Sequence, residues 1–320
     1  MAASSDKVSH LCVLGVGGVG GYFGGRIAWA LARQNDSSWA VHFVARGAHL
    51  AKMRSRGLIL RTPEGRMTCK PASAVESLGQ APAPDVVFVC VKSYDLDGVA
   101  LQIACHCHDD TVIVPLLNGV DIHPRLRARI SGGHVLPACV FVGTHLERPG
   151  VVTQAGGEGV ILMGRDPDLP EFVPRELLDL LDRVGISCRW LGDARPALWE
   201  KYIFISAFGL VTAASGRTLG EVLLDPVLMA EVAGIMSEVV ELARSEGIDM
   251  GPDAAARAVA KANDFPFETK TSLQRDVEAG RRHEGDLFGG AILRLGERHG
   301  IPTPHTERVY SRVRPARRML

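Results

Sequence analysis

The first half of the chain alternates short apolar runs with segments of helical spacing. The strand-like runs span residues 10–14, 39–47, 85–92 and 110–119. The run at 85–92 is apolar almost throughout, which is typical of a strand buried on both faces of a parallel sheet. Residues 23–31 lie between the first two runs and have apolar positions at helical spacing. This alternation predicts a parallel sheet covered by helices.

The pattern changes in the second half. Residues 130–165 contain shorter β-like pieces, which we expect to continue the sheet at its edge, and residues 174–186 have helical spacing. Strand signals fade from 196 onward, and helical periodicity dominates in segments 197–214, 226–246, 252–261 and 285–299. We therefore predict a doubly wound α/β domain of the Rossmann type at 1–192 and an all-helical domain at 193–320.

A glycine-rich loop follows the first strand and opens the first helix, with the sequence GVGGVG. Its first glycine permits a tight turn, the second lets the backbone approach a pyrophosphate, and the third lets helix and strand pack closely. The helix N-terminus offers N–H groups and a positive dipole end to an anion. An ordinary glycine-rich turn is the alternative. The residues predicted to bind a dinucleotide are Gly15, Val16, Gly17, Gly18, Val19 and Gly20.

Polar residues at the ends of the next strands refine this prediction. The strand at 39–47 reaches Arg46 where an NAD site usually has Asp or Glu. Because a guanidinium suits a 2′-phosphate, NADPH is the predicted cofactor, although Arg46 could also be a solvated surface residue. Lys92 and Asn118 end the following two strands, where a doubly wound sheet places its ligand site.

Composition excludes several classes of function. Hydrophobic residues make up 46% of the chain and charged residues 22%, and the formal net charge is zero. These values describe a soluble globular protein with no overall field that attracts nucleic acid or an anionic membrane. The basic end, RVRPARRML, is interpreted as a solvated tail. We predict neither a nucleic-acid nor a membrane partner.

Cysteine usage points to a cytoplasmic protein without a metal site. The seven cysteines have no paired CxxC spacing, which fits reduced thiols. The tract ACHCHDD at 104–110 alternates Cys and His, so its side chains would project to different sides, and no second cluster completes a site. Glycine interrupts the apolar N-terminal run, so neither a signal peptide nor a membrane span is predicted.

One lysine stands in the apolar stretch LWEKYIFISAFGL at 198–210. Lys201 could extend its ammonium group to water from the edge of a buried helix, as such lysines usually do. A positioned ammonium group can also stabilise a developing oxyanion and supply a proton. The stretch alone leaves both interpretations open.

Several motifs together resemble the ketopantoate reductase (2-dehydropantoate 2-reductase) family. They are GVGGVGGYFGGRIA, VARGAHL, VCVKSYDL, LLNGV, WEKYIF and TSLQRDVEAGRRHEGDLFGGAILRLGERHGIPTP, which occur in order over residues 9–312. The block SLQRDVEAGRRHEGD is much more specific than the glycine loop. The resemblance implies an enzyme that uses NADPH to reduce a 2-oxo acid.

The resemblance also implies roles for individual residues. Lys201 matches the catalytic lysine that polarises the ketone and protonates the alkoxide, and Asn118 matches an asparagine between cofactor and substrate. Ser272 matches a serine that binds the substrate carboxylate. Glu284 matches an acidic residue on the cofactor side of the site, assigned to catalysis and cofactor binding. Arg46 and Lys92 match contacts to the cofactor phosphates. From the residues alone, Ser272 could instead cap a helix, and Glu284 could complement a helix dipole.

The chain departs from the family pattern at three positions. Ile205 and Gly209 stand where the family usually has asparagines, and Thr269 replaces a third asparagine. Two alternatives to ketopantoate reduction therefore remain: a related enzyme for another 2-oxo acid or ketone, and a non-enzymatic NADPH-binding redox sensor. The sequence leaves monomer and homodimer both open.

Overall fold

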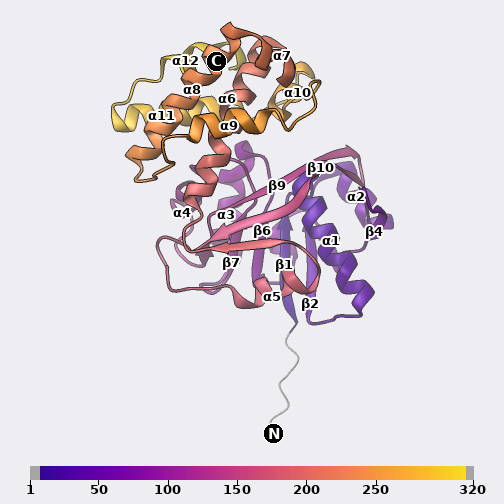
Figure 1. Cartoon of the computed structure of the whole chain (residues 1–320). Helices are drawn as coiled ribbons and strands as arrows, with labels where there is room; N and C mark the ends of the chain where they lie inside the picture. The colour runs from indigo at the N-terminus through magenta and orange to yellow at the C-terminus, as the bar shows by residue number, and fades with distance from the viewer. Residues whose placement is uncertain (1–7, 315–320) are drawn as a thin grey trace, which may run out of the picture. The chain divides into compact units, whose positions relative to one another are not determined.

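The computed structural model describes residues 8–314 of the 320-residue chain. Residues 1–7 and the last part of the basic tail, 315–320, lie outside the described residues. Contacts divide the chain into two compact units. The α/β unit comprises residues up to 118 and 122–194, and the helical unit comprises 119–121 and the residues from 195 onward (Figure 1).

A six-stranded parallel sheet forms the centre of the α/β unit. Its strands, in spatial order, are β5 (Ser73–Val75), β2 (Trp39–Val44), β1 (Ser9–Leu14), β6 (Val86–Val89), β7 (Val112–Pro115) and β8 (His134–Val135). All five neighbouring pairs are parallel. After β1, the strands β2 and β5 are added on one side of β1, and β6, β7 and β8 are added on its other side. The strand order therefore reverses between β1 and β6. Ligands of such sheets bind at this reversal point.

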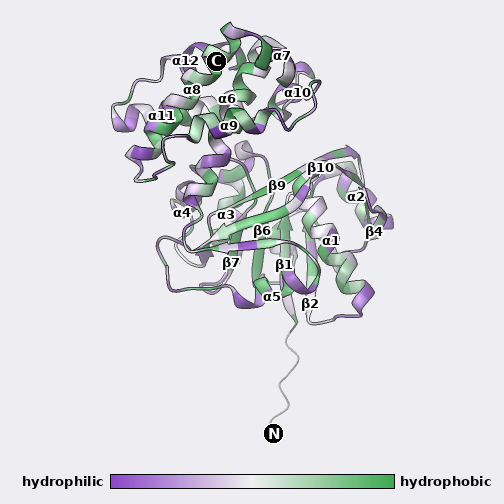
Figure 2. Cartoon of the chain, in the orientation of Figure 1, coloured by the Kyte–Doolittle hydropathy of each residue, from purple (hydrophilic) through white to green (hydrophobic). Residues whose placement is uncertain are grey.

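Helices cover both faces of the parallel sheet. The helices of this unit are α1 (Gly18–Gln34), α2 (Gly47–Arg56), α3 (Leu96–His106), α4 (Ile122–Arg127) and α5 (Arg175–Arg183), with short turns η1 (Leu78–Gln80) and η2 (Ser93–Asp95). Leu11 and Val13 of β1 belong to the core shared with α1, whereas the equally buried Cys12 faces the other layer. The central strands are therefore apolar on both sides, as predicted (Figure 2). The predicted Rossmann-type architecture is confirmed.

The prediction for residues 130–165 is wrong in part. Only β8 joins the edge of the parallel sheet, whereas β9 (Ala138–Arg148) and β10 (Val151–Gly164) form a long antiparallel pair in a second sheet. That sheet has the order β11 (Cys188–Leu191), β10, β3 (Leu58–Thr62) and β4 (Gly65–Cys69), with β9 on β10. Register shifts interrupt the β9–β10 ladder next to Val151 and on both sides of Gly156.

The second unit is helical, as the periodicity predicts, and it is built around α6. Its elements are α6 (Arg195–Ser215), α7 (Leu219–Leu224), α8 (Pro226–Ser245), α9 (Ala254–Ala262), α10 (Ser272–Glu278), the π-helical turn η3 (Asp286–Gly290), α11 (Ala291–His299) and α12 (Pro304–Val313). By length and composition α6 could cross a membrane, but 56% of its most apolar window is buried inside the protein. It packs against α8, α9, α10 and α12, which is the position of a core helix.

Candidate active site

The glycine loop after β1 has the geometry that its spacing predicts. Gly15 has φ +89°, a conformation that side chains rarely adopt, and a Cβ there would lie 2.8 Å from Cγ1 of Val91. A Cβ on Gly20 would collide with the carbonyl oxygen of Gly15 and lie 2.9 Å from Cβ of Cys90. The first and third glycines are therefore required by the turn and by the packing of α1 on the sheet.

The second glycine of the motif faces open space. A Cβ on Gly17 would have no atom within 4 Å. Gly17 is the N-cap of α1, no side chain caps it, and the first turn of the helix contains no acidic residue. Its free N–H groups suit an anion. Beside them, Oγ1 of Thr144 is buried without a hydrogen-bond partner and lies 2.8 Å from where a Cβ on Gly18 would be. These features fit a bound pyrophosphate.

His49 in α2 holds this loop in place, and the sequence reasoning missed it. Its Nε2 donates to the carbonyl oxygen of Val16 at 2.7 Å, and its Nδ1 accepts from the amide of Gly150 at 2.8 Å. Both bonds together require the neutral ring with the proton on Nε2. Burial lowers the pKa of His49, an effect partly opposed by the bond to Val16, so the ring stays neutral at pH 7. The motif VARGAHL contains His49, but nothing in its spacing indicates a link to the loop.

The other predicted cofactor residues follow neighbouring strands. Arg46 follows β2, its side chain is 77% exposed, and it pairs with Asp95 at 3.2 Å. Lys92 follows β6 and is half-buried, and its carbonyl accepts from the amide of Asp95 at 2.9 Å. Asn118 follows β7, next to Gly119 with φ +113°. Since β2, β1, β6 and β7 are consecutive in a parallel sheet, these residues and the glycine loop lie along one edge of the sheet.

Lys201 lies in the second turn of α6 and is half-buried. The adjacent Tyr202 is fully buried, and its hydroxyl donates to the carbonyl oxygens of Leu287 and Phe288 in η3, each at 2.9 Å. A π-helical turn leaves carbonyls without their usual partners, and Tyr202 provides one. Burial raises the pKa of Tyr202 well above its ordinary value, so the hydroxyl stays protonated. This bond fixes α6 against the segment that follows Glu284.

Ser272 and Glu284 lie at the starts of two further helical segments. Ser272 is the exposed first residue of α10, but the N-cap is Thr271, whose Oγ1 accepts from the amide of Gln274 at 3.2 Å. The capping alternative for Ser272 is therefore wrong. Glu284 is half-buried just before η3, and its carbonyl accepts from the amide of Leu287 at 3.0 Å. Glu200, the sequence neighbour of Lys201, is paired with Arg257 at 2.8 Å.

The positions that depart from the family pattern share one face of α6 with Lys201. Ile205 and Gly209 follow Lys201 by four and eight residues, which places them on successive turns of the same face. Ile205 is half-buried and Gly209 is buried. A Cβ on Gly209 would make ordinary contact with the ring of Phe288, at 3.9 Å. This face is therefore apolar beyond the lysine, and Gly209 leaves space there.

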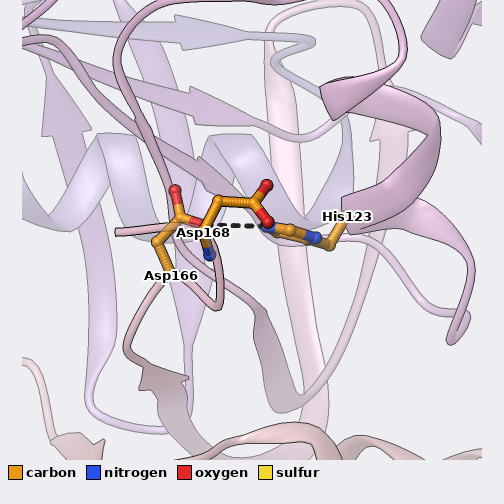
Figure 3. Close-up of side chains that lie close together, drawn as sticks. All are labelled: His123, Asp166 and Asp168. Carbon is orange, nitrogen blue, oxygen red and sulfur yellow. Dashed lines mark hydrogen bonds and ion pairs between the residues drawn. The ribbon is translucent and has the colours of Figure 1, made fainter. Parts of the chain in front are cut away.

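The residues that the structure describes contain one group with metal-ligand geometry, and it is not the Cys/His tract. Ligand atoms of His123, Asp166 and Asp168 lie within 4.8 Å of one another (Figure 3). Asp166 is fully buried, forms an ion pair with Arg127, and accepts from Nε2 of His123 at 3.1 Å. Burial would raise the pKa of Asp166, but the amide of Asp168 and Arg127 outweigh it and hold that pKa below its ordinary value. Arg127 already supplies the cation, so the group is structural.

An uncapped glycine turn, at the point where the order of a parallel sheet reverses, defines a Rossmann-type dinucleotide-binding protein. The helical unit narrows the class further. The chain belongs to the ketopantoate reductase family: the model for ketopantoate reductase PanE/ApbA matches residues 11–168, and the model for its C-terminal part matches residues 193–317.

Relatives span nearly the whole chain. The uncharacterized oxidoreductase YkpB of Bacillus subtilis is 27% identical over 302 residues, covering 94% of this chain and 96% of that protein. A 2-dehydropantoate 2-reductase of Mesorhizobium japonicum is 28% identical over 324 residues, covering 95% and 96%. A ketopantoate reductase of the PanE/ApbA family from Ralstonia eutropha has a solved structure that superimposes with a TM-score of 0.85 at 27% identity, covering 95% of this chain and 97% of that one.

Proposed function

We propose that this protein reduces a 2-oxo acid to the 2-hydroxy acid with NADPH, and that the substrate is 2-dehydropantoate, which gives pantoate in pantothenate biosynthesis. The match of the two family models to both units carries the proposal. The chain also has Asn118, Lys201, Ser272 and Glu284 at the positions where the family motifs have their functional residues. A redox sensor would need none of these four side chains.

The proposed chemistry assigns a task to each side chain. With NADPH held at the glycine loop, the ketone carbon of the substrate would receive a hydride from the coenzyme. Lys201 stabilises the negative charge that develops on the ketone oxygen and donates the proton that completes the alcohol. Ser272 donates a hydrogen bond to the substrate carboxylate. Glu284 favours the charged form of Lys201.

Arg46 supports NADPH over NADH. Its guanidinium is mostly exposed and held by one carboxylate, that of Asp95, so a 2′-phosphate has access to it. The fold by itself does not decide the coenzyme, because D-mandelate dehydrogenase with NADH shares it at a TM-score of 0.79 and 18% identity. We expect Arg46→Ala to weaken NADPH binding at least ten-fold and NADH binding much less. Equal losses for both coenzymes would refute the phosphate contact.

A second candidate is the same reaction on another 2-oxo acid. Ile205 and Gly209 remove two amides from the face of α6 that carries Lys201, and Thr269 removes a third. Each amide lost from a buried polar site changes substrate discrimination by about 1–3 kcal/mol. An apolar face suits a less polar 2-oxo acid at least as well as ketopantoate.

Steady-state NADPH oxidation with ketopantoate and a panel of other 2-oxo acids tests both candidates. Lys201→Ala should lower turnover by several orders of magnitude and leave NADPH affinity within a few-fold, whereas Lys261→Ala, an exposed lysine on α9, should change neither. A Lys201→Ala enzyme with half the normal rate would refute the catalytic role. A high rate on a different acid supports the second candidate, and tight NADPH binding without any turnover supports a sensor. A cytoplasmic location and pairing with a second copy stay predictions.

A further inference from the structure

Four arginines converge on a hollow in the α/β unit, away from the glycine loop in sequence. We call it the arginine hollow, and its lining residues are Arg56, Ile59, Arg61, Arg66, Arg148, Pro149, Gly150 and Val151. They come from three segments: the end of α2, the β3–β4 hairpin and the turn between β9 and β10. The cavity volume is about 120 Å³. One water molecule needs about 10–15 Å³, so the hollow has room for a group several times larger.

The positive charge of the arginine hollow is poorly compensated. Glu147 pairs with Arg61 at 3.0 Å and with Arg148 at 3.2 Å. None of the acidic groups in residues 8–314 pairs with Arg56 or Arg66. Four guanidinium groups therefore meet one carboxylate, which leaves an excess of three positive charges. The ribbon next to the label of β4 has the colour of hydrophilic residues in Figure 2.

Two of these arginines are placed against each other. Arg61 in β3 and Arg66 in β4 are direct cross-strand partners in an antiparallel pair. Like charges at directly opposite positions destabilise a sheet. Charged residues on an edge strand can prevent aggregation, and β4 is an edge strand. Protection against aggregation requires charge on β4 alone. It does not explain why Arg56 and Arg148 also line the arginine hollow.

We propose that the arginine hollow is a binding site for a multiply charged phosphate anion of the pyrophosphate type. Guanidinium groups bind phosphate oxygens through paired N–H donors, and an anion between Arg61 and Arg66 would remove their repulsion. The amide of Gly150 donates to His49 and is not available to the anion, so the guanidinium groups provide the contacts. The site is additional to the proposed reductase activity and does not depend on it.

Isothermal titration with inorganic pyrophosphate at physiological ionic strength tests the site, with phosphate and sulfate as comparison anions. We expect one equivalent to bind, and Arg66→Gln or Arg56→Gln to weaken the affinity about ten-fold. Arg175→Gln, an exposed arginine on α5, is the matched control and should have no effect. Absence of pyrophosphate binding to the wild-type protein overturns the proposal. Equal affinities for sulfate and pyrophosphate would also overturn the proposal, because they would show that the hollow binds an adventitious ion only.

Pyrophosphate could instead occupy the glycine loop, and two measurements separate the sites. Binding at the arginine hollow should persist at saturating NADPH and in Arg46→Gln; loss in both, with unchanged binding by Arg66→Gln, overturns the proposal. In buffer without multivalent anions, Arg66→Gln should melt at the same temperature as the wild type or higher, because it relieves the repulsion from Arg61. A clearly lower melting temperature would show that Arg66 has a structural role and overturns the proposal.

Discussion

Replacing two glycines of the loop one at a time separates coenzyme binding from packing. The Cβ of Gly17→Ala would meet no atom within 4 Å, and the backbone φ of −78° is common for alanine, while the ψ of −147° lies just beyond the β region. At an N-cap this change costs about 1 kcal/mol of folding free energy or less. The methyl group fills the space through which a pyrophosphate approaches the backbone. We therefore expect the Kd for NADPH to rise at least ten-fold, or about 1.4 kcal/mol, with little change in stability.

Gly20→Ala should have the opposite effect. Its Cβ would collide with the carbonyl oxygen of Gly15, and the same Cβ would lie 2.9 Å from Cβ of Cys90. The helix α1 must therefore move away from β1. An extra methyl group in a packed interior costs about 1–3 kcal/mol. Urea unfolding followed by circular dichroism measures the stability of both variants, and NADPH fluorescence measures affinity. Unchanged NADPH affinity in Gly17→Ala would refute the pyrophosphate role of the loop. A Gly20→Ala protein as stable as the wild type would refute the packing argument.

Three further predictions concern buried polar groups. His49→Asn keeps an acceptor near the position of Nδ1 but loses the donor to Val16, whereas His49→Gln can keep that donor. His49→Asn should therefore weaken NADPH binding more than His49→Gln. A higher Kd for His49→Gln would contradict the role of His49 in holding the glycine loop. Burial, and to a lesser extent His10, lowers the pKa of His42 from 6.5 to about 4. The unfolded chain therefore takes up a proton that the folded chain refuses, and stability should fall between pH 6.5 and 4 by about 3 kcal/mol at most. Urea unfolding at pH 7 and 5 should show a smaller loss in His42→Gln. Asp166→Asn should cost about 3 kcal/mol near pH 7, because it removes the buried negative charge that pairs with the mostly buried Arg127. This difference should shrink as the pH falls through the lowered pKa of Asp166. Equal stability in urea at pH 7 would contradict it.

Apolar patterning predicts those parts of the fold whose pattern is unbroken. The strands at 85–92 and 110–119 are β6 and β7, and the segment 226–246 is α8, because each is buried on a constant face or on both faces. The segment 285–299 has helical spacing throughout, yet it begins with the π-helical turn η3, which no spacing rule indicates. The sequence analysis predicts no strand in the segment 58–69, and it forms the β3–β4 hairpin. The pairing of β3 with β10 could not be predicted, because it depends on a contact that is distant in the sequence, with Ile59 opposite Val151.

The residues of the candidate site also differ in whether a local sequence pattern could predict them. Gly15 and Gly20 could be predicted because a positive φ and a close helix–strand contact each demand glycine, whatever the rest of the chain does. His49 and Thr144 could not, because their importance comes from the elements beside which they lie: His49 joins α2 to the loop and to the β9–β10 turn, and Thr144 reaches the loop from β9. Lys201 is intermediate, since a single lysine in an apolar helix is ambiguous until other motifs accompany it. A residue whose role lies in its own backbone can be predicted from a local motif, whereas one that acts through a distant partner requires the fold.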